Sequence, residues 1–141
     1  MQIAIRPFHI DDMEPTISLW QACGLTRPWN DPRKDIQRKL DEAPALFLLA
    51  VHAERVVGSV MAGYDGHRGW IYYLAVLPDY QSQGIGKKLV LESEDRLLAL
   101  GCPKIQLMIR RDNHTVSAFY QAMGYEASDV LVLGKRLIED I

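Results

Sequence analysis

The sequence predicts an α/β (α+β) fold, in which four helices flank a mixed, mostly antiparallel sheet of six or seven strands. Two observations predict this fold. The apolar patterns follow one another in the order β-α-α-β-β-β-α-β-α-β, and a helical pattern separates the fourth strand from the fifth. A helical crossover normally makes the two strands that it joins parallel, whereas the short turns between the second, third and fourth strands make that part antiparallel.

Each element has its own local signal. Strands are expected where short apolar runs alternate with polar residues or stand between turn residues. These runs are residues 2–8, 45–53, 55–64, 70–77, 104–110 and, as one or two strands, 125–137. Helices are expected where apolar residues recur every three or four positions, over residues 12–22, 32–42, 87–100 and 113–123. Asp31 and Asn113 are the expected caps of the second and fourth helices.

Composition limits the classes of protein to consider. At 141 residues, the chain is expected to form a single domain over residues 1–141. Its net charge of −2 does not suggest general binding of nucleic acid, and its two cysteines lack the spacing of a zinc site or a disulfide framework. No apolar run approaches the roughly 20 residues that span a bilayer. We therefore expect a cytoplasmic protein that binds neither membranes nor nucleic acid.

The stretch YQSQGIGKKL places two glycines, Gly84 and Gly86, at the entrance of the third helix. Glycine destabilises a helix by about 0.5–1 kcal/mol relative to alanine, so its use here indicates either a close approach to the backbone or a tight turn. A P-loop is excluded because Gln81 and Lys88 replace its first glycine and its Ser or Thr, and Leu89 replaces the third glycine of a dinucleotide fingerprint. The remaining pattern, QxxGxG after a strand, can direct several N–H groups at an anion beside the positive end of a helix.

Two segments carry a resemblance to a known family. The stretch LAVLPDYQSQGIGKKL resembles the acyl-CoA pyrophosphate segment of the GNAT-superfamily N-acetyltransferases, and NHTVSAFYQAMGY resembles the family's N-x-x-x-x-A-x-x-Y-x-x-x-G-[FY] helix. The resemblance runs from the first strand to Leu137. The shorter stretches RPWNDP, GYDGHRG, GCPKIQ and LGKRLIED resemble the bacterial YpeA-type branch.

The resemblance implies acetyl-CoA as co-substrate, without a metal. Main-chain N–H groups from Gln81 to Lys87 would hold the pyrophosphate, and Leu74 to Val76 would pair with the pantetheine arm as an added strand does. A backbone amide near Val76 would polarise the thioester carbonyl. The parallel fourth and fifth strands must splay apart to admit the arm, and we expect a bulge in the fourth. The expected coenzyme-binding residues are Leu74, Ala75, Val76, Gln81, Ser82, Gln83, Gly84, Ile85, Gly86, Lys87, Asn113 and Tyr120.

Asn113 and Tyr120 each have two interpretations. Asn113 either caps its helix alone or also bonds the pantetheine amide. Tyr120 is either a core aromatic residue beside Phe119 or, as the family pattern implies, the catalytic general acid for the departing thiolate. A tyrosine with a pKa near 10 is protonated at neutral pH, which suits that role. Neither Cys23 nor Cys102 is expected to act as a nucleophile.

The general base is less well defined. Some relatives carry a glutamate two residues before the arginine that ends the fifth strand, and Met108 stands at that place here. A direct glutamate base is therefore not expected. The remaining candidate bases are Asp31, Asp65, His67, Tyr72 and Tyr73.

The acceptor side is expected from the loop between the first two helices and from the hairpin before the fourth strand. Its candidate residues are Trp29, Asn30, Asp31, Asp65, His67, Tyr72 and Tyr73. Because neighbouring residues of a strand project to opposite faces, at most one of Tyr72 and Tyr73 is expected to face the cleft. Trp29 is either a lid on the core or a pocket wall, Asp31 either a helix cap or a cation-binding group, and His67 either a polar hairpin residue or a proton-transfer group.

These observations together predict an acetyl-CoA-dependent N-acetyltransferase that acts by direct attack of a primary amine, with a small-molecule amine favoured. The alternatives are a protein α-amine or lysine acetyltransferase and a non-catalytic acyl-CoA-binding module. Strands near the C-terminus could pair across a homodimer.

Overall fold

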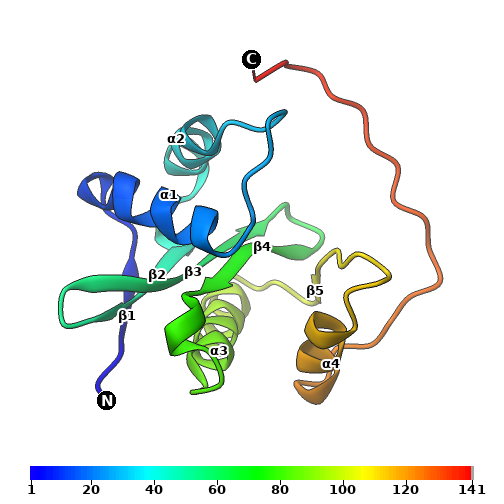
Figure 1. Cartoon of the computed structure of the whole chain (residues 1–141). Helices are drawn as coiled ribbons and strands as arrows, with labels where there is room; N and C mark the ends of the chain where they lie inside the picture. Colours follow the sequence, from blue (N-terminus) through cyan, green and yellow to red (C-terminus); the bar gives the residue numbers. More distant parts are fainter. Residues whose placement is uncertain (141) are drawn as a thin grey trace. The chain divides into compact units, whose positions relative to one another are not determined.

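A five-stranded sheet in the order β1-β2-β3-β4-β5 organises the first part of the chain, in a computed structural model that describes residues 1–140 (Figure 1). The strands are β1 Ala4–Pro7, β2 Phe47–His52, β3 Arg55–Tyr64, β4 Gly69–Val76 and β5 Ile105–Gln106. The first four strands pair antiparallel, and β4 and β5 pair parallel. The mixed sheet with parallel fourth and fifth strands is therefore confirmed.

The helices occur where the sequence predicts them. They are α1 Met13–Ala22, α2 Pro32–Glu42, α3 Ile85–Ala99 and α4 His114–Ala122, with 3₁₀ turns over Ile10–Asp12, Pro44–Leu46 and Pro78–Tyr80. Asp31 caps α2, because its side chain accepts hydrogen bonds from the N–H groups of Arg33 at 2.9 Å and Lys34 at 3.4 Å. No helix in the described chain is both long and apolar enough to cross a membrane.

The chain divides into two compact units, which are described separately below. The first consists of Met1–Gln106 together with the residues from Asp140, and the second of Leu107–Glu139. The whole sheet and α1 to α3 belong to the first unit, and α4 belongs to the second.

Helices cover both faces of the sheet. Ser59 of β3 accepts a hydrogen bond from the indole N–H of Trp20 in α1 at 2.9 Å. The neighbouring residue, Gly58, lies against Leu89 of α3, which a Cβ at position 58 would approach to 3.1 Å. Because successive residues of a strand face opposite sides, α1 and α3 pack on opposite faces, as Figure 1 shows. A fully buried aromatic core of Trp20 and Phe47 lies on the α1 side.

A β-bulge interrupts β4 at Tyr73. Ser59 is opposite Ala75 and Met61 is opposite Tyr72, so β4 contains one residue more than β3 over this interval. The backbone of Tyr73 is left-handed, with φ of 53°. The buried hydroxyl of Ser59 donates to the Tyr73 carbonyl at 2.8 Å, which satisfies a backbone acceptor at the point where the ladder shifts. The bulge expected in the fourth strand is confirmed.

The sheet has fewer strands than expected. The described structure contains five, and residues 125–137 form none of them, so the expectation of six or seven is corrected. A strand needs a neighbour for its backbone N–H and C=O groups. The apolar run that suggested the extra strand is exposed instead, with Leu131 and Leu133 at 82% and 91%.

Parallel pairing between β4 and β5 covers only Gly69 and Trp70, the first two residues of β4. Within the described chain, no paired strand continues this edge from Ile71 to Val76. Within the described residues of the first unit, this edge of β4 therefore has no strand partner from its third residue onward, and it is called the open edge below.

Candidate active site

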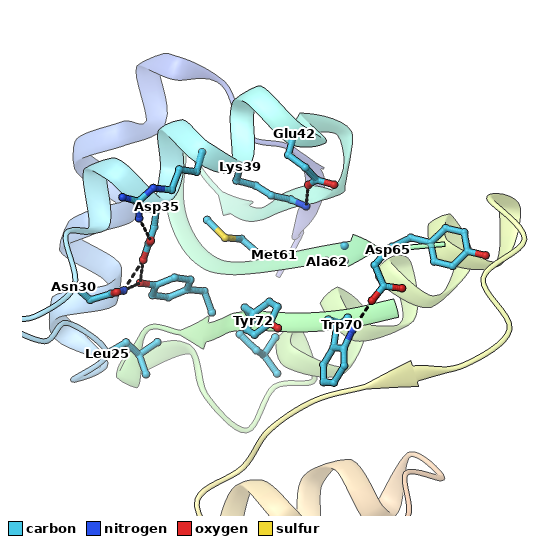
Figure 2. A pocket seen from close by; sticks show the side chains of 15 residues that line it. Leu25, Asn30, Asp35, Lys39, Glu42, Met61, Ala62, Asp65, Trp70 and Tyr72 are labelled. Atoms are coloured by element: carbon cyan, nitrogen blue, oxygen red, sulfur yellow. Dashed lines mark hydrogen bonds and ion pairs between the residues drawn. The ribbon is translucent and has the colours of Figure 1, made fainter. Parts of the chain in front are cut away.

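A cavity of about 760 Å³ lies between α2 and the strands β3 and β4 of the first unit. Its walls come from α2, the loop before it, the end of β3 and the middle of β4. Figure 2 shows Asn30 and Asp35 on one side, Asp65 and Trp70 on the other, and Met61 and Tyr72 between them. The sequence placed several of these residues in one site, and the structure brings together Asn30, Asp65, Tyr72 and Tyr73.

A hydrogen-bonded group of three side chains forms one end of the cavity. The Tyr73 hydroxyl donates to the Asp35 carboxylate at 2.7 Å, and the side-chain amide of Asn30 donates to the same carboxylate oxygen. Burial, together with the hydrogen bond to Asp35, raises the pKa of Tyr73. Tyr73 therefore stays protonated at neutral pH and acts as a donor, which argues against its role as a general base.

Asp65 lies at the other end and is held in a tight turn. Its Oδ1 accepts from the N–H groups of Arg68 at 2.7 Å and His67 at 2.8 Å, and its Oδ2 accepts from the indole of Trp70 at 3.3 Å. The backbone hydrogen bonds, first of all that of Arg68, lower the pKa of Asp65. Asp65 is thus an anion at neutral pH, with each of its oxygens already engaged.

The middle of the cavity carries an ion pair between Lys39 and Glu42 at 2.9 Å. The Lys39 side chain is only 10% exposed, and its ammonium lies close to Gly63 on β3, 3.5 Å from where a Cβ would stand. Because each charge has its partner on the same helix, this part of the wall carries no net charge.

Three of the predicted acceptor residues do not line the cavity. Trp29 is 55% exposed, so it is neither packed on the core nor part of the wall. Asp31 acts as the helix cap, and His67 is an exposed residue of the turn before β4. For Asp31 and His67 the local structure is enough to explain the residue.

Tyr72 and Tyr73 both line the cavity, so the prediction that only one faces it is wrong. The bulge is the physical reason, because it adds a residue at Tyr73 and breaks the alternation of faces. Tyr73 stacks on Trp20 at 3.8 Å between ring centroids, on the α1 side of the sheet.

The open edge of β4 leads to the glycine-containing turn. The carbonyl of Val76 accepts from the Gln81 side-chain amide at 3.0 Å and from the Cys23 thiol at 3.3 Å, and the next residue, Leu77, donates its N–H to Val57 of β3. Val76 therefore directs its backbone groups away from β3, since neighbouring residues alternate. Burial raises the pKa of the Cys23 thiol, which keeps it protonated.

The turn itself presents backbone donors at the start of α3. Gly84 occupies the N-cap position with φ of 82°, a left-handed conformation that explains this glycine without a ligand. It offers no side-chain cap to the first N–H groups of α3. Gly86 lies inside α3 and is not among the residues of positive φ, so backbone conformation does not explain it. The N–H of Gln81 is engaged with Pro78 at 3.3 Å, which leaves the donors from Ser82 onward.

The second unit contains the other two predicted residues. The Asn113 side chain caps α4 by accepting from the N–H of Val116 at 3.2 Å, through its Oδ1. Tyr120 is buried, and its ring contacts Phe119 and Tyr125 edge-on at 5.0 and 5.3 Å between centroids. Burial raises the pKa of Tyr120, so its hydroxyl is protonated at neutral pH.

Comparison with known proteins assigns this chain to a family. A sequence model of the "Acetyltransferase (GNAT) family" matches residues 13–125, which is most of the chain. The chain belongs to the GNAT acetyltransferase family. It is 57% identical over 137 residues to an acetyltransferase of Sodalis glossinidius, covering 96% of each chain. Its YpeA-type assignment within the family stays a prediction.

Solved structures show the same fold. Ard1 of Thermoplasma volcanium matches with a TM-score of 0.82 and 23% identity, over 91% of this chain and 85% of its own. The PaiA N-acetyltransferase of Thermoplasma acidophilum, solved in complex with coenzyme A, matches with a TM-score of 0.72 and 23% identity, over 92% and 93%. Members of the GNAT family take their acetyl group from acetyl-CoA. Among the described residues, no group of three or more His, Cys, Asp or Glu side chains could hold a metal ion.

Sequence reasoning missed several residues of this GNAT acetyltransferase. Asp35, Arg38, Lys39 and Glu42 of α2 and Trp70 of β4 line the cavity, although none was predicted there. A charged helix such as α2 usually indicates a solvent-exposed surface. The available signal was helical spacing, because Asp35 and Lys39 are four residues apart and so share a face of α2.

Proposed function

We propose that this acetyltransferase moves the acetyl group of acetyl-CoA directly to the primary amine of a small molecule, without an acyl-enzyme intermediate. One observation supports this above all. In the described part of the first unit, β4 has no strand partner on one edge after Trp70, and the bulge at Tyr73 brings two tyrosines to the neighbouring cavity. The same few residues of β4 thus face both proposed substrates.

The turn before α3 fits the diphosphate of acetyl-CoA. The N–H groups of Ser82, Gln83, Gly84, Ile85, Gly86 and Lys87 are the proposed donors. The N-terminus of a 15-residue helix, without a side-chain cap, favours a bound anion. Exposed Lys87 and Lys88 add positive charge. The Gln81 side chain takes part by holding the Val76 carbonyl.

The open edge of β4 fits the pantetheine arm. Leu74, Ala75 and Val76 would pair with its amides as a neighbouring strand pairs, and the outward N–H of Val76 would donate to the thioester carbonyl oxygen as negative charge develops there. The side-chain amide nitrogen of Asn113, which the helix cap does not use, is the proposed donor to a pantetheine carbonyl.

Tyr120 is the proposed proton donor to the departing thiolate. Its raised pKa keeps the hydroxyl protonated over the neutral range, as a proton donor must be. Neither cysteine is proposed as a nucleophile, since Cys23 is a protonated thiol bound to a backbone carbonyl and Cys102 is buried.

A small acceptor is favoured by the cavity. Its volume of about 760 Å³ lies within the range of small-molecule sites, roughly 300–1,000 Å³. Aromatic rings of Tyr64, Trp70, Tyr72 and Tyr73 contribute to its walls, and polar groups lie at its ends. We also propose that the protein acts in the cytoplasm, where its two free cysteines stay reduced. A homodimer stays a prediction, to be tested by light scattering.

The test is a thiol-release assay with acetyl-CoA and a panel of amines. The panel contains putrescine, kanamycin, L-phenylalanine, a peptide with a free α-amine and an acetyl-capped lysine peptide. The proposal expects turnover with at least one of the first three compounds. Turnover with peptides alone would reassign the acceptor to a protein. If calorimetry shows that acetyl-CoA binds but no amine is turned over, the result would favour the alternative of a non-catalytic acyl-CoA-binding module.

A further inference from the structure

We propose that Asp35 binds the amino group of the acceptor and that Asp140, far along the chain, keeps Asp35 available for this task through Arg38. The proposal rests on the acetyl-transfer function above and names two residues that the sequence did not predict. The three side chains form one network in the first unit of the structure.

Asp35 is the carboxylate best placed to meet an amine. Its side chain is 20% exposed and lines the cavity. It bonds the hydroxyl of Tyr73, and Tyr73 is followed by Leu74, the first residue of the proposed coenzyme edge. An ammonium group bound to Asp35 would therefore lie at the end of the cavity that is nearer to the thioester.

The other carboxylates of the cavity are less suited. Glu42 pairs with Lys39 at 2.9 Å, so its charge is already compensated. Asp65 lies at the opposite end of the cavity, and two backbone N–H groups of its own turn hold one of its oxygens. Asp35 accepts as many hydrogen bonds as Asp65, but its donors are all side chains: Tyr73, Asn30 and a distant Arg38. A carboxylate offers about four acceptor positions, so Asp35 can still accept from an amine.

Arg38 is shared unequally between two carboxylates. Its Nη2 contacts Asp140 Oδ1 at 2.8 Å, whereas its Nη1 is 3.4 Å from both Asp140 Oδ2 and Asp35 Oδ1. The side chain of Asp140 is fully buried, and it also accepts the N–H of Asp31 at 3.1 Å. Asp140 thus holds the guanidinium on its own side and fixes the start of α2.

The charges explain what this sharing achieves. The Arg38 guanidinium faces two carboxylates and lies closer to that of Asp140, so it compensates the charge of Asp35 only in part. Without the Asp140 carboxylate, Arg38 would pair fully with Asp35, because the two residues lie one turn apart on α2. The acceptor would then compete with an internal cation for its binding group. Asp140 is in this sense a positioning residue, and Asp35 is the binding residue.

The first experiment measures steady-state kinetics with the best amine of the panel, alongside calorimetry with acetyl-CoA. Asp35→Asn should lower kcat/KM for the amine by about 10- to 150-fold, the range of one hydrogen bond to a charged group, with unchanged acetyl-CoA affinity. The matched control is Asp41→Asn, an exposed aspartate of the same helix outside the cavity wall, which should change neither value. If the wild type is active and kcat/KM for Asp35→Asn stays within threefold of it, the inference about Asp35 is wrong but the proposed function stands. A wild type that turns over no amine overturns the proposed function and this inference with it.

The second experiment tests the role of Asp140. Asp140→Asn should raise KM for the amine by about tenfold while kcat changes little, because Arg38 then neutralises Asp35. The double variant Asp140→Asn/Arg38→Gln should recover most of the lost affinity, because Asp35 is again free of a competing cation. A purely structural role predicts the opposite, since removing both partners would do at least as much damage as removing one. Thermal unfolding of each variant shows whether it is folded under the assay conditions. The positioning role is wrong if KM for the amine is unchanged in a folded Asp140→Asn enzyme. It is also wrong if the double variant has a KM no lower than that of the single variant.

Discussion

Replacing Gly86 by alanine should raise stability and weaken coenzyme binding at once. Gly86 lies in the first turn of α3 and is not among the residues of positive φ, so alanine fits its backbone. Alanine stabilises a helix by about 0.5–1 kcal/mol relative to glycine, which should raise Tm by about 2–4 °C in a chain of this size. A methyl group that displaces the diphosphate from one backbone donor costs about 1.5–3 kcal/mol, or about 10- to 150-fold in Kd.

Gly84→Ala is the matched comparison, since it adds the same methyl group two residues earlier. Its φ of 82° is left-handed, so alanine should destabilise the protein by about 1–2 kcal/mol whether or not a ligand binds. Isothermal titration with acetyl-CoA and thermal unfolding of both variants check the contrast. Unchanged acetyl-CoA affinity in a stabilised Gly86→Ala variant would refute the contact between the diphosphate and this backbone.

Three further predictions concern other parts of the chain. Ser59→Ala removes the buried partner of both the Tyr73 carbonyl and the Trp20 indole N–H, so urea unfolding should show a loss of at least about 1–3 kcal/mol; no loss would mean that neither group needs the Ser59 hydroxyl. Arg38 lowers the pKa of Asp140 to about 2, from about 3.8. The stability that this provides is present above pH 4 and lost as pH falls toward 2, and Asp140→Asn should remove this pH dependence from acid-unfolding curves; a wild-type curve in the variant would contradict it. Tyr120→Phe should lower kcat by about 10²- to 10⁴-fold with unchanged acetyl-CoA affinity, and a wild-type kcat would exclude the acid role.

The sequence predicted the order of elements well because their signals are local. The Asp31 cap, the proline that follows it and the period of apolar residues in α1 to α4 act over a few neighbours, so each can be interpreted without tertiary contacts. The prediction of strands near the C-terminus was wrong for the same reason. The run Val130–Leu133 has the composition of a strand, but composition does not supply the neighbour that a strand needs.

The candidate site was predicted in part. Asn30, Asp65, Tyr72 and Tyr73 were expected near the acceptor, and they do line one cavity. The position of Tyr73 depends on a bulge, and the local composition of β4 does not indicate which residue is the extra one. Asp35 was missed because its role depends on partners from β4 and from the end of the chain, which only the folded structure brings together.

The extra residue in β4 has a consequence for how this enzyme can vary. Removing Tyr73 would leave β3 and β4 in an uninterrupted register, with Tyr72 still opposite Met61 and Ile71 still opposite Ala62. The same deletion would remove the hydroxyl that binds Asp35 and the ring that stacks on Trp20. The bulge therefore adds one aromatic side chain to the cavity without changing the faces of its neighbours, so a deletion at this position would alter the cavity wall while the rest of the sheet kept its pairing.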